Sequence, residues 1–101
     1  MSKTLHQREN ALFRAQLRQT REAAGLTQSD LARAIGRTQV FVSHIERGVR
    51  RLDTVELLQI CRAMGTELKA FSAEFQDAAD ALQNPSTPRA TVTSRPRSRM
   101  T

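Results

Sequence analysis

Four glycines divide the chain into segments in which apolar residues recur every three or four positions. This spacing is typical of helices that bury one face. A glycine directly after such a segment commonly ends the helix. The pattern therefore predicts four helices that end at glycines and a fifth that follows the last of them. The glycines are Gly25, Gly36, Gly48 and Gly65.

Apolar positions and polar caps give the extent of each helix. The first helix carries Phe13 and Leu17 on its buried face, and the hydroxyls of Thr27 and Thr38 can cap the second and third. No stretch alternates apolar and polar residues for long enough to predict a strand, so the expected fold class is all-α. We expect the second to fifth helices over residues 28–35, 39–47, from 53 or 54 to 64, and from about 66 to 83.

Composition divides the chain into parts. Residues 84–101 contain four arginines, all three prolines and no acidic residue, with almost nothing apolar to bury, which predicts a disordered tail. We expect a flexible arm over residues 1–9, a folded domain over residues 10–72 and the fifth helix over residues 67–83. The single cysteine, Cys61, excludes an intrachain disulfide and agrees with a reducing cytoplasm. No apolar run is long enough for a signal peptide or a membrane span.

Residues 27–48, TQSDLARAIGRTQVFVSHIERG, predict two short helices joined by a turn of about three residues. This is the spacing of a helix-turn-helix motif, which we place at residues 28–47. Gly36 opens the turn, where a positive φ would cost a residue with a Cβ about 1 kcal/mol. Ala32 is small where the two helices would cross. The apolar seam between them consists of Leu31, Ile35, Val42 and Ile45.

Once that seam is buried, the second helix of the motif presents its other face to solvent. A glutamine amide can pair with N6 and N7 of adenine, a small apolar side chain can contact a thymine methyl, and an imidazole can donate to or accept from a base edge. Arginines surround this face, and their planar guanidinium groups suit phosphates. The candidate base-reading residues are Gln39, Val40, Ser43 and His44.

The motif resembles that of the lambda-repressor-like (Cro/XRE) helix-turn-helix family. The similarity extends from LRQTREAAGLTQ through LDTVELLQICRAMG, over about residues 10–72. It implies a five-helix DNA-binding domain, here with a longer fifth helix. Two positions depart from the family pattern: Thr20 stands where an aliphatic residue is usual, and Arg37 is a charge at a turn position that is often apolar.

The resemblance also implies roles for individual residues. Gln39, Val40 and His44 correspond to positions that read bases. Arg21 and Glu46 correspond to an ion pair, and if the pair is buried, removing one partner should cost about 3–5 kcal/mol. Together with the positions of the arginines, the resemblance gives these expected phosphate contacts: Gln28, Arg37, Thr38, Arg47, Arg50 and Arg51.

The expected fifth helix carries apolar residues at alternating spacings of three and four. Leu68 and Phe71 are expected to cover the core of the domain itself. Phe75, Ala78 and Leu82 lie further along, and we expect them to contact a second subunit. The alternative is a long helix folded back on its own domain. The arginines of the tail either add phosphate contacts or form an inert solubilising end.

These features predict a sequence-specific regulator of transcription that binds double-stranded DNA. We expect a dimeric repressor of a palindromic operator, in the cytoplasm of a bacterium or encoded by a phage or plasmid. The alternative is an antitoxin or other interaction protein, whose motif only regulates its own operon and whose fifth helix or tail binds a protein partner. Binding by charge alone is disfavoured, because the exposed face carries Gln, Val and His and not only Arg.

An enzyme is not expected. His44, Ile45 and Glu46 begin a zinc-deaminase pattern, but the Pro-Cys-x-x-Cys run that would complete it is absent. The remaining soft ligands, His6 and Cys61, do not make a metal site. We therefore expect no metal and no cofactor. Cys61 is expected in the core, and Phe41 is expected to pack against the first or fourth helix.

Overall fold

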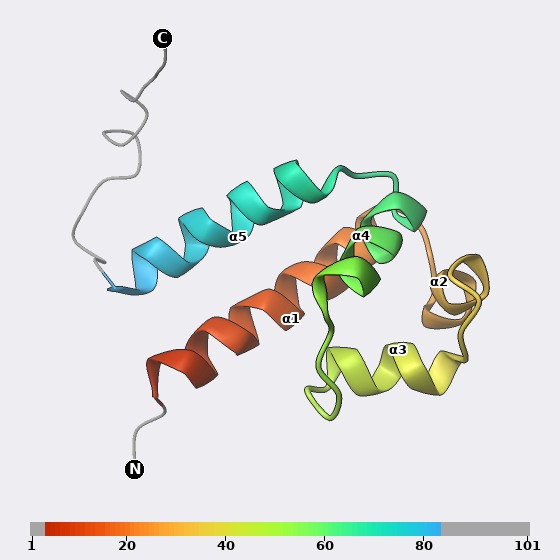
Figure 1. The fold of residues 1–101 in the computed structure, drawn as a ribbon, viewed down its shortest axis with the longest axis horizontal. Coiled ribbons are helices and arrows are strands. Elements are labelled where there is room, and N and C mark those ends of the chain that lie inside the picture. Colours follow the sequence, from red (N-terminus) through yellow and green to blue (C-terminus); the bar gives the residue numbers. More distant parts are fainter. Residues whose placement is uncertain (1–3, 84–101) are drawn as a thin grey trace, which may run out of the picture.

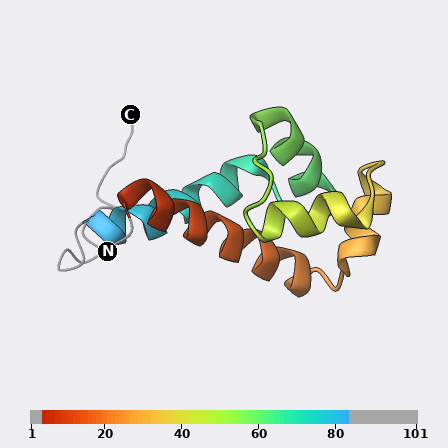
Figure 2. The same cartoon turned by 90° about the horizontal axis from the view of Figure 1, so that it is seen from below.

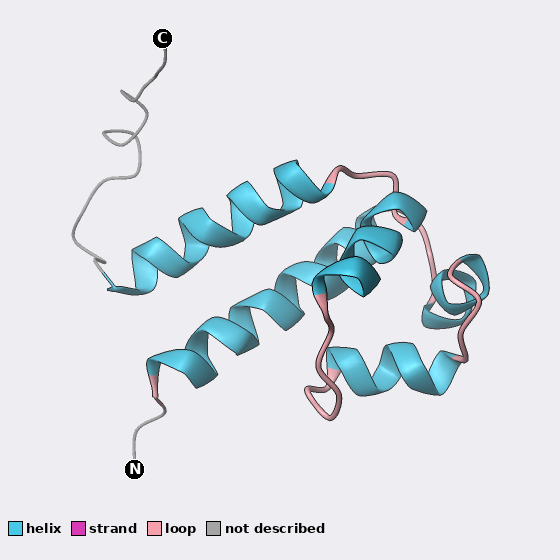
Figure 3. Ribbon diagram, in the orientation of Figure 1, coloured by secondary structure: helices cyan, strands magenta, loops and turns pink. Residues whose placement is uncertain are grey.

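The computed structural model describes residues 4–83, which form five helices and, within that range, no strand (Figures 1 and 3). The predicted all-α, five-helix fold is confirmed. No helix in this range is long and apolar enough to cross a bilayer. The helices are α1 (Leu5–Ala23), α2 (Gln28–Ala34), α3 (Gln39–Glu46), α4 (Thr54–Ala63) and α5 (Leu68–Gln83).

Side chains cap the short helices as the sequence predicts. The hydroxyl oxygen of Thr27 accepts the backbone N–H of Asp30, whose carboxylate accepts the N–H of Thr27 in return. Thr38 accepts the N–H of Phe41 at the start of α3. These caps satisfy backbone donors that have no partner within the helix. They stabilise α2 and α3, which are too short to form in isolation.

The first helix begins earlier than expected. Thr4 caps it through a reciprocal capping box with Gln7, and α1 therefore begins at Leu5. The expected flexible arm over residues 1–9 is wrong for residues 5–9. The apolar pattern gave no helix there because this turn is polar, and its cap is a Thr/Gln pair. Residues 1–3 of the arm, like the tail over residues 84–101, lie outside the described residues.

All five helices contribute to one core. The largest fully buried side chains are Leu17, Leu31, Val42, Ile60 and Cys61. Burying an aliphatic side chain of this size contributes about 1.5–3 kcal/mol. Burial also raises the pKa of the Cys61 thiol, which keeps it neutral, as expected of a small core residue.

The long helices α1 and α5 lie side by side in both views (Figures 1 and 2). The ring of Phe13 makes edge-to-face contacts with Phe71 and Phe75, at centroid distances of 6.0 and 5.9 Å. The buried amide of Gln16 donates to the backbone carbonyl of Phe71 at 2.8 Å. Phe75 therefore packs on α1 of its own chain, next to but outside the main core cluster, and its expected contact with a second subunit stays a prediction.

Candidate nucleic-acid interface

The residues expected to read bases lie along α3 at the outside of the bundle (Figures 1 and 2). Gln39 is exposed and Val40 is 53% exposed, whereas Ser43 and His44 are half-buried. Val42 and Ile45, on the opposite side of the same helix, are buried in the core. Because that side of α3 is buried, the candidate base-reading residues lie on the side that faces outward.

A chain of hydrogen bonds connects the interior to this outward face. Arg21 donates from Nε and Nη2 to the two carboxylate oxygens of Glu46, at 2.7 and 3.0 Å. Their side chains are 9% and 4% exposed. Arg21 also donates to the carbonyl of Leu26 at 2.8 Å. The hydrogen bond to Glu46 raises the pKa of Arg21, so the guanidinium stays charged although it is buried.

Gln28 extends this chain to the surface. Its amide nitrogen donates to Glu46 at 3.0 Å, and its amide oxygen accepts from Nε2 of Gln39 at 2.6 Å. The carboxamide of Gln39 therefore has a fixed orientation. It still has its oxygen and one N–H free for a ligand, the acceptor and donor that adenine requires.

A second cluster lies at the edge of α3, where Glu56 of α4 binds two arginines. Arg50 donates from Nη1 and Nη2 to the two carboxylate oxygens at 3.1 and 3.0 Å, and Arg37 donates to one of them at 3.3 Å. The hydrogen bond from Arg50, aided by the backbone N–H of Asp53, lowers the pKa of Glu56 to about 2.

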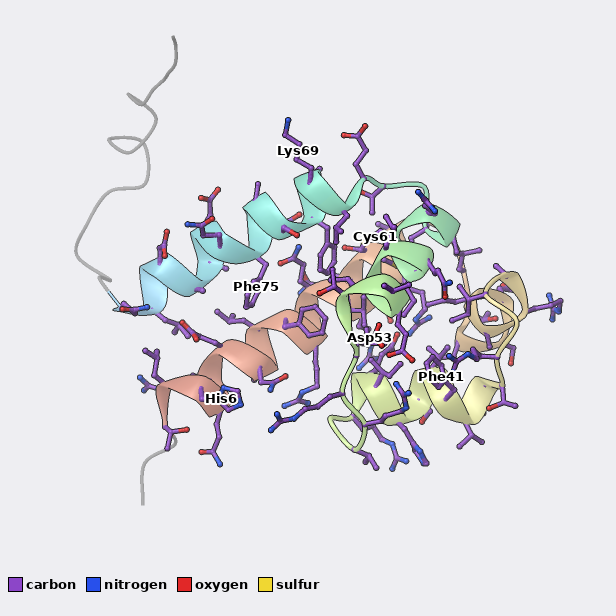
Figure 4. The ribbon with its side chains drawn as sticks, viewed as in Figure 1. His6, Phe41, Asp53, Cys61, Lys69 and Phe75 are labelled. Atoms are coloured by element: carbon purple, nitrogen blue, oxygen red, sulfur yellow. The ribbon has the colours of Figure 1, made fainter. Side chains whose placement is uncertain are left out.

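Phe41 supports both guanidinium groups of this cluster. The Cζ atoms of Arg37 and Arg50 lie 4.3 and 4.6 Å from the centroid of its ring. In Figure 4 the ring lies on the side of α3 that faces α4. Phe41 is thus half-buried and packs against the core, as expected, and it also contacts two cations. The sequence separates Arg37 from Glu56 by 19 positions, and no local spacing indicates that they meet.

A groove of about 450 Å³ lies between the first half of α1 and the loop after α3. The guanidinium of Arg14 faces Gly48 so closely that a Cβ there would lie 3.0 Å from it. Among the described residues no Asp or Glu lines the groove, and Arg14 has no hydrogen-bond partner. The sequence did not single out Arg14. The polar and charged lining residues are His6, Gln7, Asn10, Arg14, Arg50 and Arg51.

The remaining expected contact residues do not pair with Glu46 or Glu56. Thr38, Arg47 and Arg51 are exposed around α3 and its following loop. Ala78 and Leu82, expected at a dimer interface, are half-buried on α5, at the far side of the bundle from α3 (Figure 1). Among the described residues no group of three or more His, Cys, Asp or Glu side chains is arranged to hold a metal ion.

Comparison with known proteins agrees with this geometry. A family model described as a helix-turn-helix domain matches residues 12–71, more than half of the chain. A solved structure of an XRE-family like protein from Pseudomonas syringae pv. tomato str. DC3000 is similar, with 37% sequence identity and a TM-score of 0.69. The match covers 72% of this chain and 89% of that one. The chain belongs to the Cro/XRE-like helix-turn-helix family. No curated protein matches it.

Membership of the helix-turn-helix family indicates that the protein is a DNA-binding regulator. One departure from the family pattern now has a structural reason. Thr20 takes the place of an aliphatic residue on α1, and its hydroxyl donates to the carbonyl of Gln16 at 2.8 Å. Because the hydroxyl is satisfied within its own helix, the polar residue is tolerated at this half-buried position.

Proposed function

We infer that the protein is a transcriptional repressor that binds a palindromic operator in double-stranded DNA as a dimer. The observation that carries this proposal is the hydrogen-bonded chain from Arg21 through Glu46 and Gln28 to Gln39. A side chain held in one orientation before binding loses less entropy when it binds. The base-reading residues of the proposal are Gln39, Val40, Ser43 and His44.

Phosphate contacts around this face fix the position of α3 in the major groove without reading sequence. The exposed side chains of Thr38, Arg47 and Arg51 are available for this role as they stand. Gln28 retains one amide hydrogen for a phosphate, because its other polar contacts are with Glu46 and Gln39. Arg37 and Arg50 are proposed contacts as well, although each is paired with Glu56.

The proposed dimer brings together the apolar stripes of two α5 helices, where each stripe is left partly exposed. Ala78 and Leu82 are half-buried, and Phe75 contributes the part of its ring that Phe13 does not cover. Two recognition helices about 34 Å apart would read half-sites one helical turn apart. The two-fold symmetry of such a dimer is what requires a palindromic operator.

Selection from random duplexes at about 150 mM salt, followed by sequencing of the bound pool, tests the proposal. Recovery of a two-fold-symmetric site with half-sites one helical turn apart is the expected result. A pool with no enrichment, bound by contacts that weaken steeply with salt, would instead indicate binding by charge alone or a protein-interaction role.

Replacement of Gln39 by alanine tests base reading directly. We expect Gln39→Ala to weaken operator binding by about 1–3 kcal/mol and to relax the preference at one base pair of each half-site. The same selection, repeated with the variant, measures this. An equal loss of affinity for every sequence would show that Gln39 does not read a base.

A further inference from the structure

Two of the arginines assigned to phosphates already bind an anionic group in the free protein. Glu56 presents both carboxylate oxygens to Arg50 and one of them to Arg37. The paired geometry at Arg50 is the one in which a guanidinium also binds the oxygens of a phosphate. The Phe41 ring holds both guanidinium groups near this carboxylate.

Glu56 is fixed in place, whereas the arginines are accessible. Its side chain is 13% exposed, and it accepts the backbone N–H of Asp53 at 3.0 Å in the capping box of α4. The side chains of Arg37 and Arg50 are each 41% exposed. The carboxyl, with its pKa near 2, is ionised throughout the physiological range. A phosphate can therefore reach the arginines from solvent, but it must compete with a permanent negative charge.

We propose that Glu56 acts as an internal substitute for a DNA phosphate that holds Arg37 and Arg50 until a duplex displaces it. This inference rests on the proposed function. Each phosphate contact by these arginines is an exchange of one anion for another, so it adds less affinity than a contact by an unpaired arginine. The exchange lowers the affinity for every duplex by a similar factor, because phosphate contacts do not read sequence. Glu56 thus limits the charge-driven part of the affinity for DNA and does not itself touch DNA.

The test compares Glu56→Gln with Asp30→Asn. Glutamine keeps the size of the side chain and its place in the capping box. Asp30 is a matched control, because it holds the same position in the capping box of α2 and pairs with an arginine, Arg33, outside the proposed phosphate contacts. Both substitutions raise the net charge by one. Fluorescence anisotropy with a duplex of random sequence, between 50 and 200 mM salt, gives the affinity and its salt dependence.

We expect Glu56→Gln to tighten binding to the random duplex by about tenfold at 50 mM salt. The slope of log K against log salt should steepen by about 0.9 for each arginine released to a phosphate. Asp30→Asn should change the affinity by about twofold or less. The affinity for the operator should rise in Glu56→Gln by a factor similar to that for the random duplex, because the released arginines contact phosphates of any sequence.

Three results would overturn the inference. Equal effects of the two variants would mean that only net charge matters. Weaker binding by Glu56→Gln, with an unchanged melting temperature, would mean that Glu56 positions the arginines for DNA. If neither the wild type nor Glu56→Gln binds duplex at 50 mM salt, the proposed function fails with it. In the first case, recovery of a palindrome by selection would show that the proposed function holds and that this inference alone fails. Glu56→Asp keeps the charge but shortens the side chain, and it serves as a second variant should Glu56→Gln fail to fold. We expect its affinity for the random duplex to lie between those of the wild type and Glu56→Gln.

Discussion

At the scale of single residues, two buried polar side chains of α1 connect it to other parts of the chain. Gln16 donates to the carbonyl of Phe71 on α5, and Arg21 donates to Glu46 on α3 and to the carbonyl of Leu26. A buried polar group costs little when it is paired, but it is expensive when it loses its partner. Such groups therefore favour one arrangement of the helices over nearby alternatives.

The ion pair between Arg21 and Glu46 should contribute strongly to stability. We expect Glu46→Ala to lower the free energy of unfolding by about 3–5 kcal/mol, because it leaves the buried guanidinium of Arg21 with only Glu22, at 4.0 Å, as a counter-charge. Urea denaturation measures this loss. The control is Arg33→Ala, which breaks an exposed pair with Asp30 and should cost less than about 1 kcal/mol. Similar losses in the two variants would contradict the structural role of Glu46.

The carboxyl of Glu56 should make stability depend on pH. Its pKa is about 2 in the folded protein against an ordinary value of 4.5, so its stabilising contribution is present above pH 4.5 and is lost as pH falls toward 2. We expect the melting temperature of Glu56→Gln to fall less steeply than that of the wild type over this range. Some slope should remain, since hydrogen bonds from Thr27 also lower the pKa of Asp30. Circular dichroism measures the melting temperature of both proteins between pH 2 and pH 4.5. Identical dependence of the melting temperature on pH in the two proteins would rule out this contribution.

At the scale of the elements, the turn of the motif depends on a backbone conformation that favours glycine. Gly36 has a φ of +72°, and a Cβ there would meet nothing within 4 Å. We expect Gly36→Ala to cost about 1 kcal/mol from backbone strain alone. Gly48→Ala should cost about as much, because its φ is +82° and the added Cβ would meet only the far end of the flexible Arg14 side chain, which can move aside. Chemical denaturation of the two variants compares these costs, and a much larger loss for Gly48→Ala would show that Arg14 cannot move.

The element boundaries show which features a sequence carries locally. Caps and glycines lie within a few residues of the helix ends that they define, and they predicted α2, α3 and α4 closely. The start of α1 was missed, since its first turn is mostly polar and begins at the capping pair of Thr4 and Gln7. The cluster of Arg37, Phe41, Arg50 and Glu56 and the place of Arg14 depend on tertiary contacts, which no spacing in the sequence encodes.

At the scale of the whole molecule, the proposed dimer depends on a contact between the α5 helices of two copies. We expect Leu82→Lys to dissociate the proposed dimer, because it places a charge in an apolar interface. Analytical ultracentrifugation and operator binding should then both show the loss. Gln76→Lys, on an exposed part of the same helix, is the control and should leave both unchanged. A Leu82→Lys protein that sediments as a dimer would locate the interface elsewhere.

The side-by-side arrangement of α1 and α5 has a topological consequence. The first and last described turns of the chain lie at the same end of the bundle, and α3 lies toward the other end (Figures 1 and 2). A short linker could therefore join residue 83 to residue 4, and the chain could be opened between α4 and α5 without breaking any helix. Segments joined to residue 4 or to residue 83 would start at that end, away from α3. We therefore expect the domain to tolerate such a permutation, or a fusion at these two positions, with α3 and its neighbours unchanged.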